Sequence, residues 1–147
     1  MIEPKRVGYT SGVFDMFHIG HLRILERARS LCDYLIVGVS TDQLVADYKG
    51  KTPIIPHADR SAIVASNRHV DEVVPQADRD KFGAWERHKF DVMFVGDDWQ
   101  GKPLFLEVER RFKEVGVEVV YFPYTKSISS TRLTEVLEKL EQDGSLL

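Results

Sequence analysis

Residues 11–21 read Ser-Gly-Val-Phe-Asp-Met-Phe-His-Ile-Gly-His, and this stretch decides the fold. The residues just before it, 7–10, include β-branched and aromatic side chains and predict a strand. After it, apolar residues recur at helical spacing from Leu22 to Cys32. The stretch is therefore predicted to be a turn from a strand into a helix, in which Gly12 lets a ligand approach the backbone closely.

The predicted helix start suits a phosphate group. Free backbone N–H groups and the partial positive charge at a helix N-terminus attract anions. His18 and His21 are three residues apart, so both should project from one side of the first turn. Together these features indicate a site at which a phosphate is attacked. One histidine could simply cap the helix, and the pair could be half of a zinc site, but His57, His69 and His88 show no matching spacing.

Composition narrows the class of protein. The length of 147 residues corresponds to a single domain spanning 1–147. A net charge of −3 argues against a nucleic-acid binder, and no apolar run approaches the roughly 20 residues of a membrane span. The one cysteine, Cys32, excludes an internal disulfide and is expected to be a buried thiol on the first helix. With no secretory signal at the first residues, we expect a cytoplasmic protein.

Strand and helix patterns alternate along the chain. Apolar runs predict strands at 7–10, 34–39, 70–74, 91–95 and 117–122. Between and after them, helical patterns follow residues 21, 40 and 129 and cover 59–67, 81–88 and 103–115. Ser40 and Gln43 resemble a capping box for the second helix. This order predicts an α/β fold, a Rossmann-like open parallel five-stranded sheet with helices on both faces.

The carboxyl ends of the predicted strands should form one crevice. Parallel strands end at the same edge of a sheet, and ligands bind there at the switch in strand order. The segments that follow strands are therefore expected to converge, although they lie far apart in the sequence. They are residues 11–21, 40–51, 96–99 and 123–131.

Further polar groups fall on this crevice. Lys49 and Lys51 flank a glycine in a loop, which is either solvated or closes over a triphosphate. Asp98 and Trp99 follow the fourth strand and either cap a turn or read and stack a nucleotide base.

Hydroxyl groups open the last predicted helix. Ser129, Ser130 and Thr131 are ordinary capping residues, but three of them at a crevice would form a second anion site, with Lys126 adding charge nearby. A triphosphate would then lie between two helix starts.

The motifs resemble a known family. Gly12-Val13-Phe14-Asp15 followed by His18-Ile19-Gly20-His21 resembles the signature of the HxGH nucleotidyltransferases. Four other stretches resemble the cytidylyltransferase branch, and most of all the bacterial glycerol-3-phosphate cytidylyltransferases. They are residues 40–42, 68–73, 96–99 and 128–131. The likeness spans about residues 7–137.

This resemblance implies transfer of CMP from CTP to a small phosphorylated alcohol, with release of pyrophosphate. Glycerol 3-phosphate is the first candidate acceptor, which would give CDP-glycerol. The alternative acceptors are phosphoethanolamine or a sugar or alditol phosphate. The alternative activity among the enzymes is that of an adenylyltransferase. A nucleotide-binding sensor without turnover is the alternative outside the enzymes. Mg²⁺ as cofactor and a homodimer are also implied, with no nucleic acid or membrane partner.

The resemblance also implies roles for residues. The catalytic residues would be His18, His21, Lys49 and Lys126. The nucleotide would contact Ser11, Gly12, Val13, Phe14, Asp15, His18, His21, Lys51, Asp98, Trp99, Tyr124, Thr125, Ile128, Ser129, Ser130 and Thr131. The acceptor would contact Lys49, Arg68 and Lys81, with a dimer contact as the alternative for Arg68. No protein side chain is implied as a metal ligand.

One position departs from the family signature. The family arginine is replaced by Tyr124 and the family glycine by Ser127. Tyrosine cannot supply the fixed positive fork of an arginine, although Lys126 could supply a charge from a neighbouring position. The departure therefore bears on the identity of the acceptor more than on cytidylyl transfer.

Overall fold

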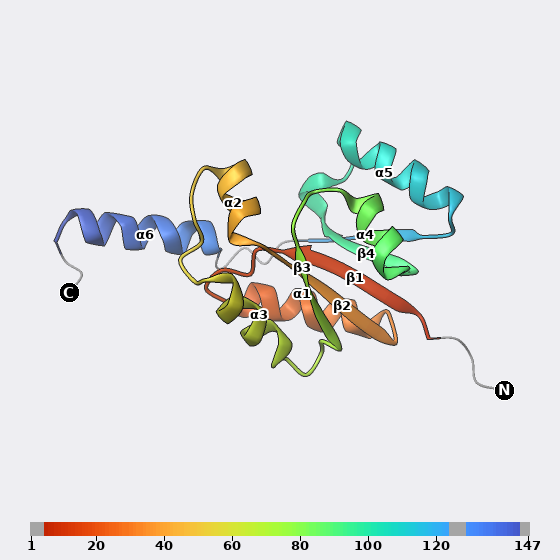
Figure 1. The fold of residues 1–147 in the computed structure, drawn as a ribbon, viewed down its shortest axis with the longest axis horizontal. Helices are drawn as coiled ribbons and strands as arrows, with labels where there is room; N and C mark the ends of the chain where they lie inside the picture. The colour runs from red at the N-terminus through yellow and green to blue at the C-terminus, as the bar shows by residue number, and fades with distance from the viewer. Residues whose placement is uncertain (1–4, 124–128, 145–147) are drawn as a thin grey trace.

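The computed structural model describes residues 5–123 and 129–144. Its strands form one sheet with the order β3-β2-β1-β4-β5 (Figure 1). All four neighbouring pairs are parallel. The strands are β1 (Val7–Gly12), β2 (Tyr34–Ser40), β3 (Glu72–Gln76), β4 (Val92–Gly96) and β5 (Glu118–Phe122). The predicted fold class, a Rossmann-like open parallel five-stranded sheet, is confirmed.

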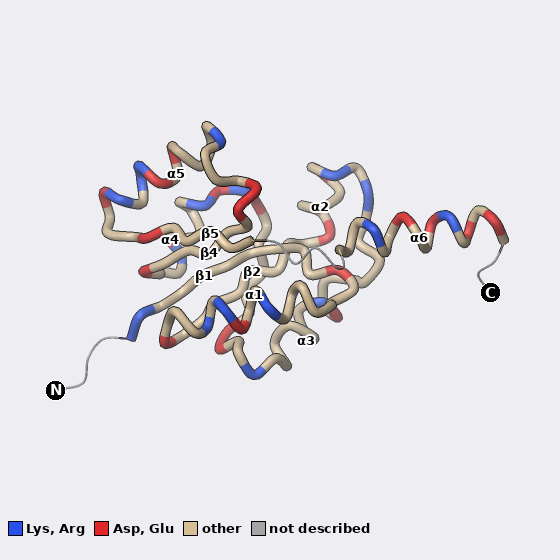
Figure 2. Tube along the Cα trace, turned by 180° about the vertical axis from the view of Figure 1, so that it is seen from behind, with Lys and Arg blue, Asp and Glu red and all other residues tan. Residues whose placement is uncertain are grey.

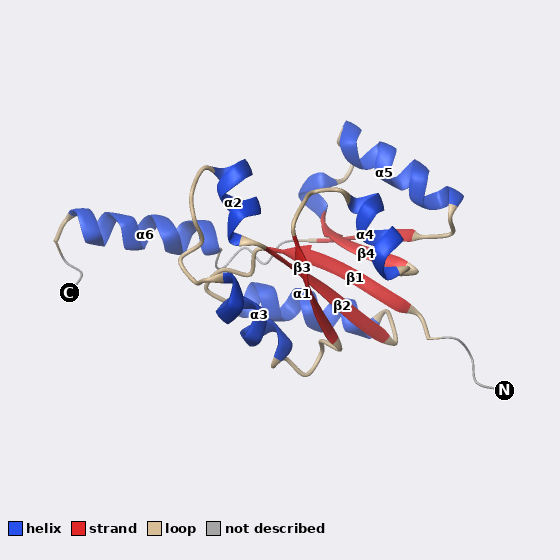
Figure 3. Ribbon diagram, viewed as in Figure 1, coloured by secondary structure: helices blue, strands red, loops and turns tan. Residues whose placement is uncertain are grey.

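Helices cover both faces of this sheet (Figure 3). They are α1 (Ile19–Ser30), α2 (Asp42–Lys49), α3 (His57–Ala65), α4 (Lys81–His88), α5 (Pro103–Glu114) and α6 (Ser130–Gln142), with a 3₁₀ turn η1 (Asp97–Trp99) after β4. Helices α1 and α3 lie on one face, and α4 and α5 lie on the other (Figure 1). Each face therefore has its own apolar core.

The two cores explain why the strands read as continuous apolar runs. Leu35, Val37 and Val39 of β2 are buried toward α1 and α3, while Ile36 belongs to the core beneath α4 and α5. Side chains alternate between the faces of a strand, so a strand covered on both sides needs apolar residues at every position.

The sheet order places a switch point beside the central strand. The chain moves outward from β1 to β2 and β3, then crosses to β4 and β5 on the other side of β1. The carboxyl ends of β1 and β4 therefore border a crevice, which is where ligands bind in such sheets.

Several expectations about local structure need correction. Thr41, not Ser40, is the N-cap of α2: its side chain accepts the N–H of Leu44 at 3.1 Å. Ser40 is still paired in β2, and the Gln43 side chain donates to Asp47, so the predicted capping box is wrong. Cys32 is buried as expected but lies just beyond the end of α1.

The third strand starts later than predicted, at Glu72 rather than Val70. The backbone N–H of Val70 donates to Asn67 O at 3.1 Å and so closes a turn instead of joining the sheet.

The last helix extends away from the sheet (Figure 1). None of its described residues is buried, and Val136 of its apolar stripe is 48% exposed. Charged residues of both signs are distributed along α5 and α6 (Figure 2). Among the described residues, no helix has the length and apolar character needed to cross a membrane.

Candidate active site

The turn after β1 has an unusual backbone. Phe14 and Met16 adopt positive φ angles of 55° and 49°, a region that L-residues seldom occupy. Such strain persists where the surroundings hold it, and it is common at functional sites. Here Asp15 is the anchor, because its buried carboxylate accepts the N–H groups of Ile54 at 2.8 Å and Ile55 at 2.9 Å.

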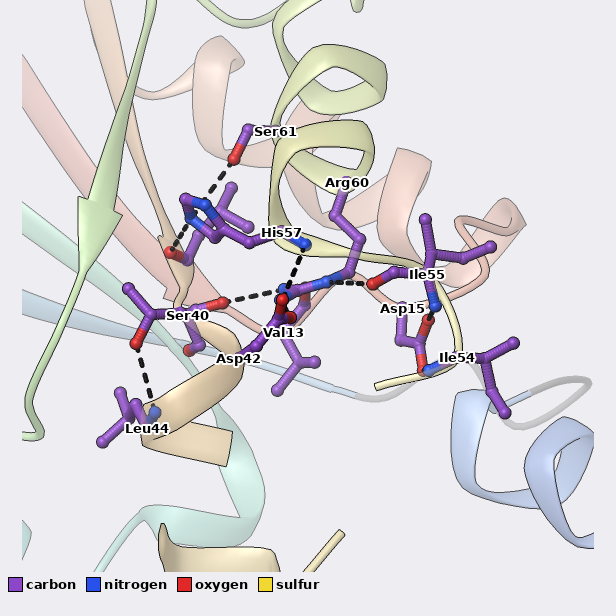
Figure 4. A network of polar contacts seen from close by, with 12 residues as sticks. Val13, Asp15, Ser40, Asp42, Leu44, Ile54, Ile55, His57, Arg60 and Ser61 are labelled. Atoms are coloured by element: carbon purple, nitrogen blue, oxygen red, sulfur yellow. Dashed lines mark hydrogen bonds and ion pairs between the residues drawn. The ribbon is translucent and has the colours of Figure 1, made fainter. Parts of the chain in front are cut away.

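A buried arginine ties this turn to two other segments (Figure 4). Arg60 of α3 is 1% exposed and donates to the carbonyl oxygens of Val13, Ser40 and Ile55 at 2.6, 2.8 and 2.8 Å. It also donates to the Asp42 carboxylate at 2.6 Å. One guanidinium thus holds the turn after β1, the end of β2 and the loop before α3 in register.

The contact with Arg60 favours the ionised form of the Asp42 carboxyl. Burial opposes its ionisation, but the hydrogen bonds from Arg60 and from the N–H of His57 outweigh burial and lower the pKa of the carboxyl. Asp42 is therefore charged at neutral pH. Sequence reasoning missed Arg60, because an arginine in a short amphipathic helix looks like a surface residue.

The two histidines of the motif form a reciprocal cap at the start of α1. His18 is the N-cap, and its Nδ1 accepts the N–H of Gly20 at 3.0 Å. His21 Nδ1 accepts the N–H of His18 at 3.1 Å. The two rings stack with centroids 3.9 Å apart. The prediction that both project from one side of the first turn is confirmed, and the capping role holds as well.

These contacts determine the protonation of the pair. Burial, and to a lesser extent the neighbouring His18, lower the pKa of His21 to about 4, against an opposing effect of Asp15. Burial also lowers the pKa of His18. Because each Nδ1 accepts a backbone N–H, the neutral rings carry their proton on Nε2. At neutral pH the motif therefore offers two uncharged N–H donors.

The start of α6 meets this motif. Ser130 Oγ donates to Asp15 O at 2.5 Å and lies 3.5 Å from His21 Nε2. Ser129 is the N-cap of α6 and accepts the N–H of Arg132 at 3.1 Å, whereas Thr131 is exposed. The expected meeting of the first and last helix starts is confirmed. Four of the predicted residues lie outside the described ones: Tyr124, Thr125, Lys126 and Ile128.

Three of the predicted lysines differ in exposure: Lys49 and Lys51 are exposed, whereas Lys81 is half-buried. Lys49 is exposed at the end of α2 and Lys51 is exposed two residues beyond it, where its Nζ lies 3.5 Å from Glu138 of α6. Lys81 is half-buried at the start of α4, with Nζ 3.4 Å from Ser11 Oγ. Burial lowers the pKa of Lys81, as does neighbouring Arg79. Lys81 thus reaches the carboxyl end of β1, as expected for a crevice residue.

The remaining predicted residues lie at opposite edges of the sheet. Asp98 and Trp99 form η1 at the carboxyl end of β4, where the indole packs on Phe105 with centroids 5.4 Å apart. Arg68 is exposed in the turn before β3, at the opposite edge from the crevice. The structure therefore does not bring Arg68 to the other site residues of the same chain, because a residue that precedes a parallel strand lies at its amino end.

The crevice carboxylates do not form a metal cage. Within the described ranges, no three His, Cys, Asp or Glu side chains are close enough to hold a metal ion. Both oxygens of Asp15 already accept backbone N–H groups. The residues that the structure describes therefore do not fit a protein-held cation here.

A parallel sheet with two helix starts and an imidazole pair at its switch point defines a Rossmann-like α/β nucleotidyltransferase. The model of the family "Cytidylyltransferase-like" matches residues 9–136, and the chain belongs to that family. Glycerol-3-phosphate cytidylyltransferase of Bacillus subtilis (strain 168) is 38% identical over 132 residues, which cover 89% of this chain and 96% of that protein.

Other similar proteins carry different names. FAD synthase of Thermococcus sibiricus (strain DSM 12597 / MM 739) is 30% identical over 142 residues, covering 95% of this chain and 96% of that protein. The solved structure of the lipopolysaccharide core biosynthesis protein from Thermoplasma volcanium GSS1 matches with a TM-score of 0.70 at 26% identity, covering 85% of this chain and 100% of that chain. Proteins similar to this chain are thus named for different activities.

Proposed function

We propose that this protein transfers CMP from CTP to a small phosphorylated alcohol and releases pyrophosphate, with glycerol 3-phosphate as the best acceptor. The observation that carries this proposal is the stacked pair of neutral imidazoles, His18 and His21, beside the start of α6. The similarity to glycerol-3-phosphate cytidylyltransferase over 89% of the chain supports the choice of nucleotide and acceptor.

The reaction needs positioning and charge stabilisation only. An oxygen of the acceptor phosphate forms a bond to the α-phosphorus of CTP. The bond from this phosphorus to the oxygen that bridges the α- and β-phosphates breaks, and pyrophosphate leaves. No covalent enzyme intermediate is required. The Nε2–H groups of His18 and His21 donate to the α-phosphoryl oxygens, where charge develops in the transition state. Lys51 and Lys126 balance the charge of the departing pyrophosphate.

The acceptor side is built from lysines. Lys81 at the start of α4 and Lys49 at the end of α2 are the cations that would meet the acceptor phosphate, and Lys81 already lies at Ser11. A phosphate dianion beside Lys81 favours its charged form and so offsets the effect of burial on its pKa.

ATP is the alternative nucleotide. The similarity to an FAD synthase is the observation that favours an adenylyltransferase. The stretch Gly96-Asp97-Asp98-Trp99, which resembles the cytidylyltransferase motif, favours CTP. A sensor that binds nucleotide without turnover is a third candidate, and it would release no pyrophosphate.

A homodimer and a Mg²⁺ requirement belong to the same proposal. Mg²⁺ ordinarily binds through substrate phosphates with few protein ligands, which suits a chain whose described residues offer no carboxylate cage.

The experiment is a pyrophosphate-release assay with CTP or ATP against a panel of acceptors. The panel contains glycerol 3-phosphate, phosphoethanolamine, phosphocholine and several sugar and alditol phosphates. We expect release with CTP and glycerol 3-phosphate. Release with ATP only would replace the nucleotide in the proposal, and CTP binding with no release from any acceptor would support the sensor.

Variants of the imidazoles test the mechanism in the same assay. His18→Ala and His21→Ala are each expected to lower turnover by about 10²–10³-fold, the usual cost of one such donor. His69→Ala, at the far end of the molecule beside Glu26, is the matched control and should retain turnover. Wild-type turnover in both motif variants would refute the roles of the imidazoles.

A further inference from the structure

A buried polar pair crosses the sheet on the face covered by α4 and α5. Tyr9 of β1 is 1% exposed and Gln76 at the end of β3 is 3% exposed. The phenol of Tyr9 donates to Gln76 Oε1. Strand β2 lies between β1 and β3, so the Tyr9 side chain must pass over β2 to reach its partner.

Gly38 of β2 makes this crossing possible. A Cβ at position 38 would overlap the Tyr9 hydroxyl and lie 3.0 Å from Gln76 Oε1. The Tyr9 ring is held on its other side by stacking on Phe90, with centroids 4.8 Å apart. This Tyr9–Gln76 bridge therefore has one geometry, because Tyr9, Gly38 and Gln76 come from three different strands and together determine it.

From Gln76 the contacts continue toward the crevice. Gln76 Nε2 donates to Asp78 O at 2.7 Å, and Asp78 Oδ1 accepts the N–H of Asp80 at 3.0 Å. Asp80 is the N-cap of α4 and accepts the N–H of Gly83 at 3.0 Å. The next residue is Lys81, whose Nζ lies 3.4 Å from Ser11 Oγ. An unbroken series of hydrogen bonds thus runs from the central strand to the start of α4.

The chemistry of the pair limits what it can do. Burial raises the pKa of the Tyr9 phenol, so it remains a protonated donor and takes no part in proton transfer. A buried polar pair is no more stabilising than well-packed apolar residues of the same shape. Its position at the end of β3, where the loop to α4 begins, indicates a geometric role.

We propose that Tyr9 and Gln76 are positioning residues for the acceptor: they hold the start of α4 so that the Lys81 ammonium lies at the crevice and meets the acceptor's phosphate. This inference rests on the proposed function. The hydrogen bonds of the bridge involve neither α1 nor the start of α6, where the imidazoles and Ser130 are proposed to meet the triphosphate. Loss of the bridge should therefore weaken acceptor binding and leave CTP binding intact.

The test is steady-state kinetics of Tyr9→Phe, which removes one hydroxyl and keeps the ring. We expect the KM for glycerol 3-phosphate to rise about 5- to 50-fold, since one buried hydrogen-bond partner is lost, while the KM for CTP changes less than about twofold. Tyr34→Phe is the matched control, because Tyr34 also donates its hydroxyl across the sheet, to Glu72 at 2.8 Å, but at the opposite edge.

A double-mutant cycle distinguishes positioning of Lys81 from a general destabilisation of the protein. In a Lys81→Ala background, Tyr9→Phe should raise the acceptor KM no further, because the group that it positions is gone. Equal increases in both backgrounds, or a parallel loss of CTP binding and thermal stability, would overturn the proposal.

A second readout does not depend on turnover. The acetylation rate of Lys81 relative to Lys113, measured by mass spectrometry, should change in Tyr9→Phe and stay constant in Tyr34→Phe. If the wild-type protein turned over no acceptor, the proposed function would fail while this labelling still tested the bridge. Unchanged labelling of Lys81 in Tyr9→Phe would overturn the positioning role itself.

Discussion

Replacing Arg60 by methionine should destabilise the fold more than any other single exchange of a charged residue near the crevice. Arg60 is 1% exposed and makes four hydrogen bonds, three to carbonyl oxygens and one to Asp42. Methionine fills much of the volume but removes this donor from all four acceptors, although Asp42 still accepts the N–H of His57. Removing one partner of a buried ion pair costs about 3–5 kcal/mol, because the other charge remains unpaired. Asp42 is 40% exposed, so water compensates it in part, and we expect about 3 kcal/mol.

Chemical and thermal unfolding of Arg60→Met would measure this loss. A destabilisation of about 3 kcal/mol corresponds to a fall in Tm of about 6–12 °C for a chain of this size. Arg110→Met is the matched control, because Arg110 also bonds to carboxylates, those of Glu107 and Glu114, but is 62% exposed. Its exposed ion pairs should contribute less than about 1 kcal/mol. Equal losses in the two variants would refute the claim that Arg60 organises the crevice.

Three further changes test other parts of the structure. The free energy of unfolding should fall as the pH drops from about 6.5 toward about 4, because unfolded His21 binds a proton in that range and the folded residue does not. His21→Gln should flatten this part of the pH–stability curve. An unaltered curve would contradict the lowered pKa of folded His21. Glu138→Gln should lower the KM for CTP by releasing Lys51, with a change in unfolding free energy below about 1 kcal/mol because the pair is exposed, and an unchanged KM would exclude competition for this lysine. Gly38→Ala should destabilise the protein by about 1–3 kcal/mol through overlap with the Tyr9 hydroxyl. In the double variant, Tyr9→Phe should recover part of that loss. Additive losses would show that the overlap is not the cause.

Much of the fold is encoded in short-range patterns. Strand β2 and helix α5 were predictable because the apolar run at 34–39 and the stripe at 103–115 are each long and regular. The histidine pair was also predictable, since residues three apart at a helix start must share a side. Capping was harder to predict: Ser40 and Thr41 are both good N-caps, and only the pairing of Ser40 in β2 assigns the role to Thr41.

Other parts of the site have no local signal. Arg60 looks like a surface residue until three carbonyl groups from separate segments converge on it. Arg68 belongs to a stretch that resembles the cytidylyltransferases, yet its place before β3 puts it at the far edge of the sheet.

The sequence by itself determined the element order and the imidazole pair, because each depends on residue spacing within one helix or strand, and the parallel sheet then follows from the alternation of strands and helices along the chain. The tertiary structure alone decided which buried polar groups are partners. A hydrogen bond forms only when two groups lie within about 3 Å, and the distance between segments far apart in the chain is set by packing, not by sequence separation. Ser130 therefore meets Asp15 across 115 positions, and Tyr9 meets Gln76 across 67.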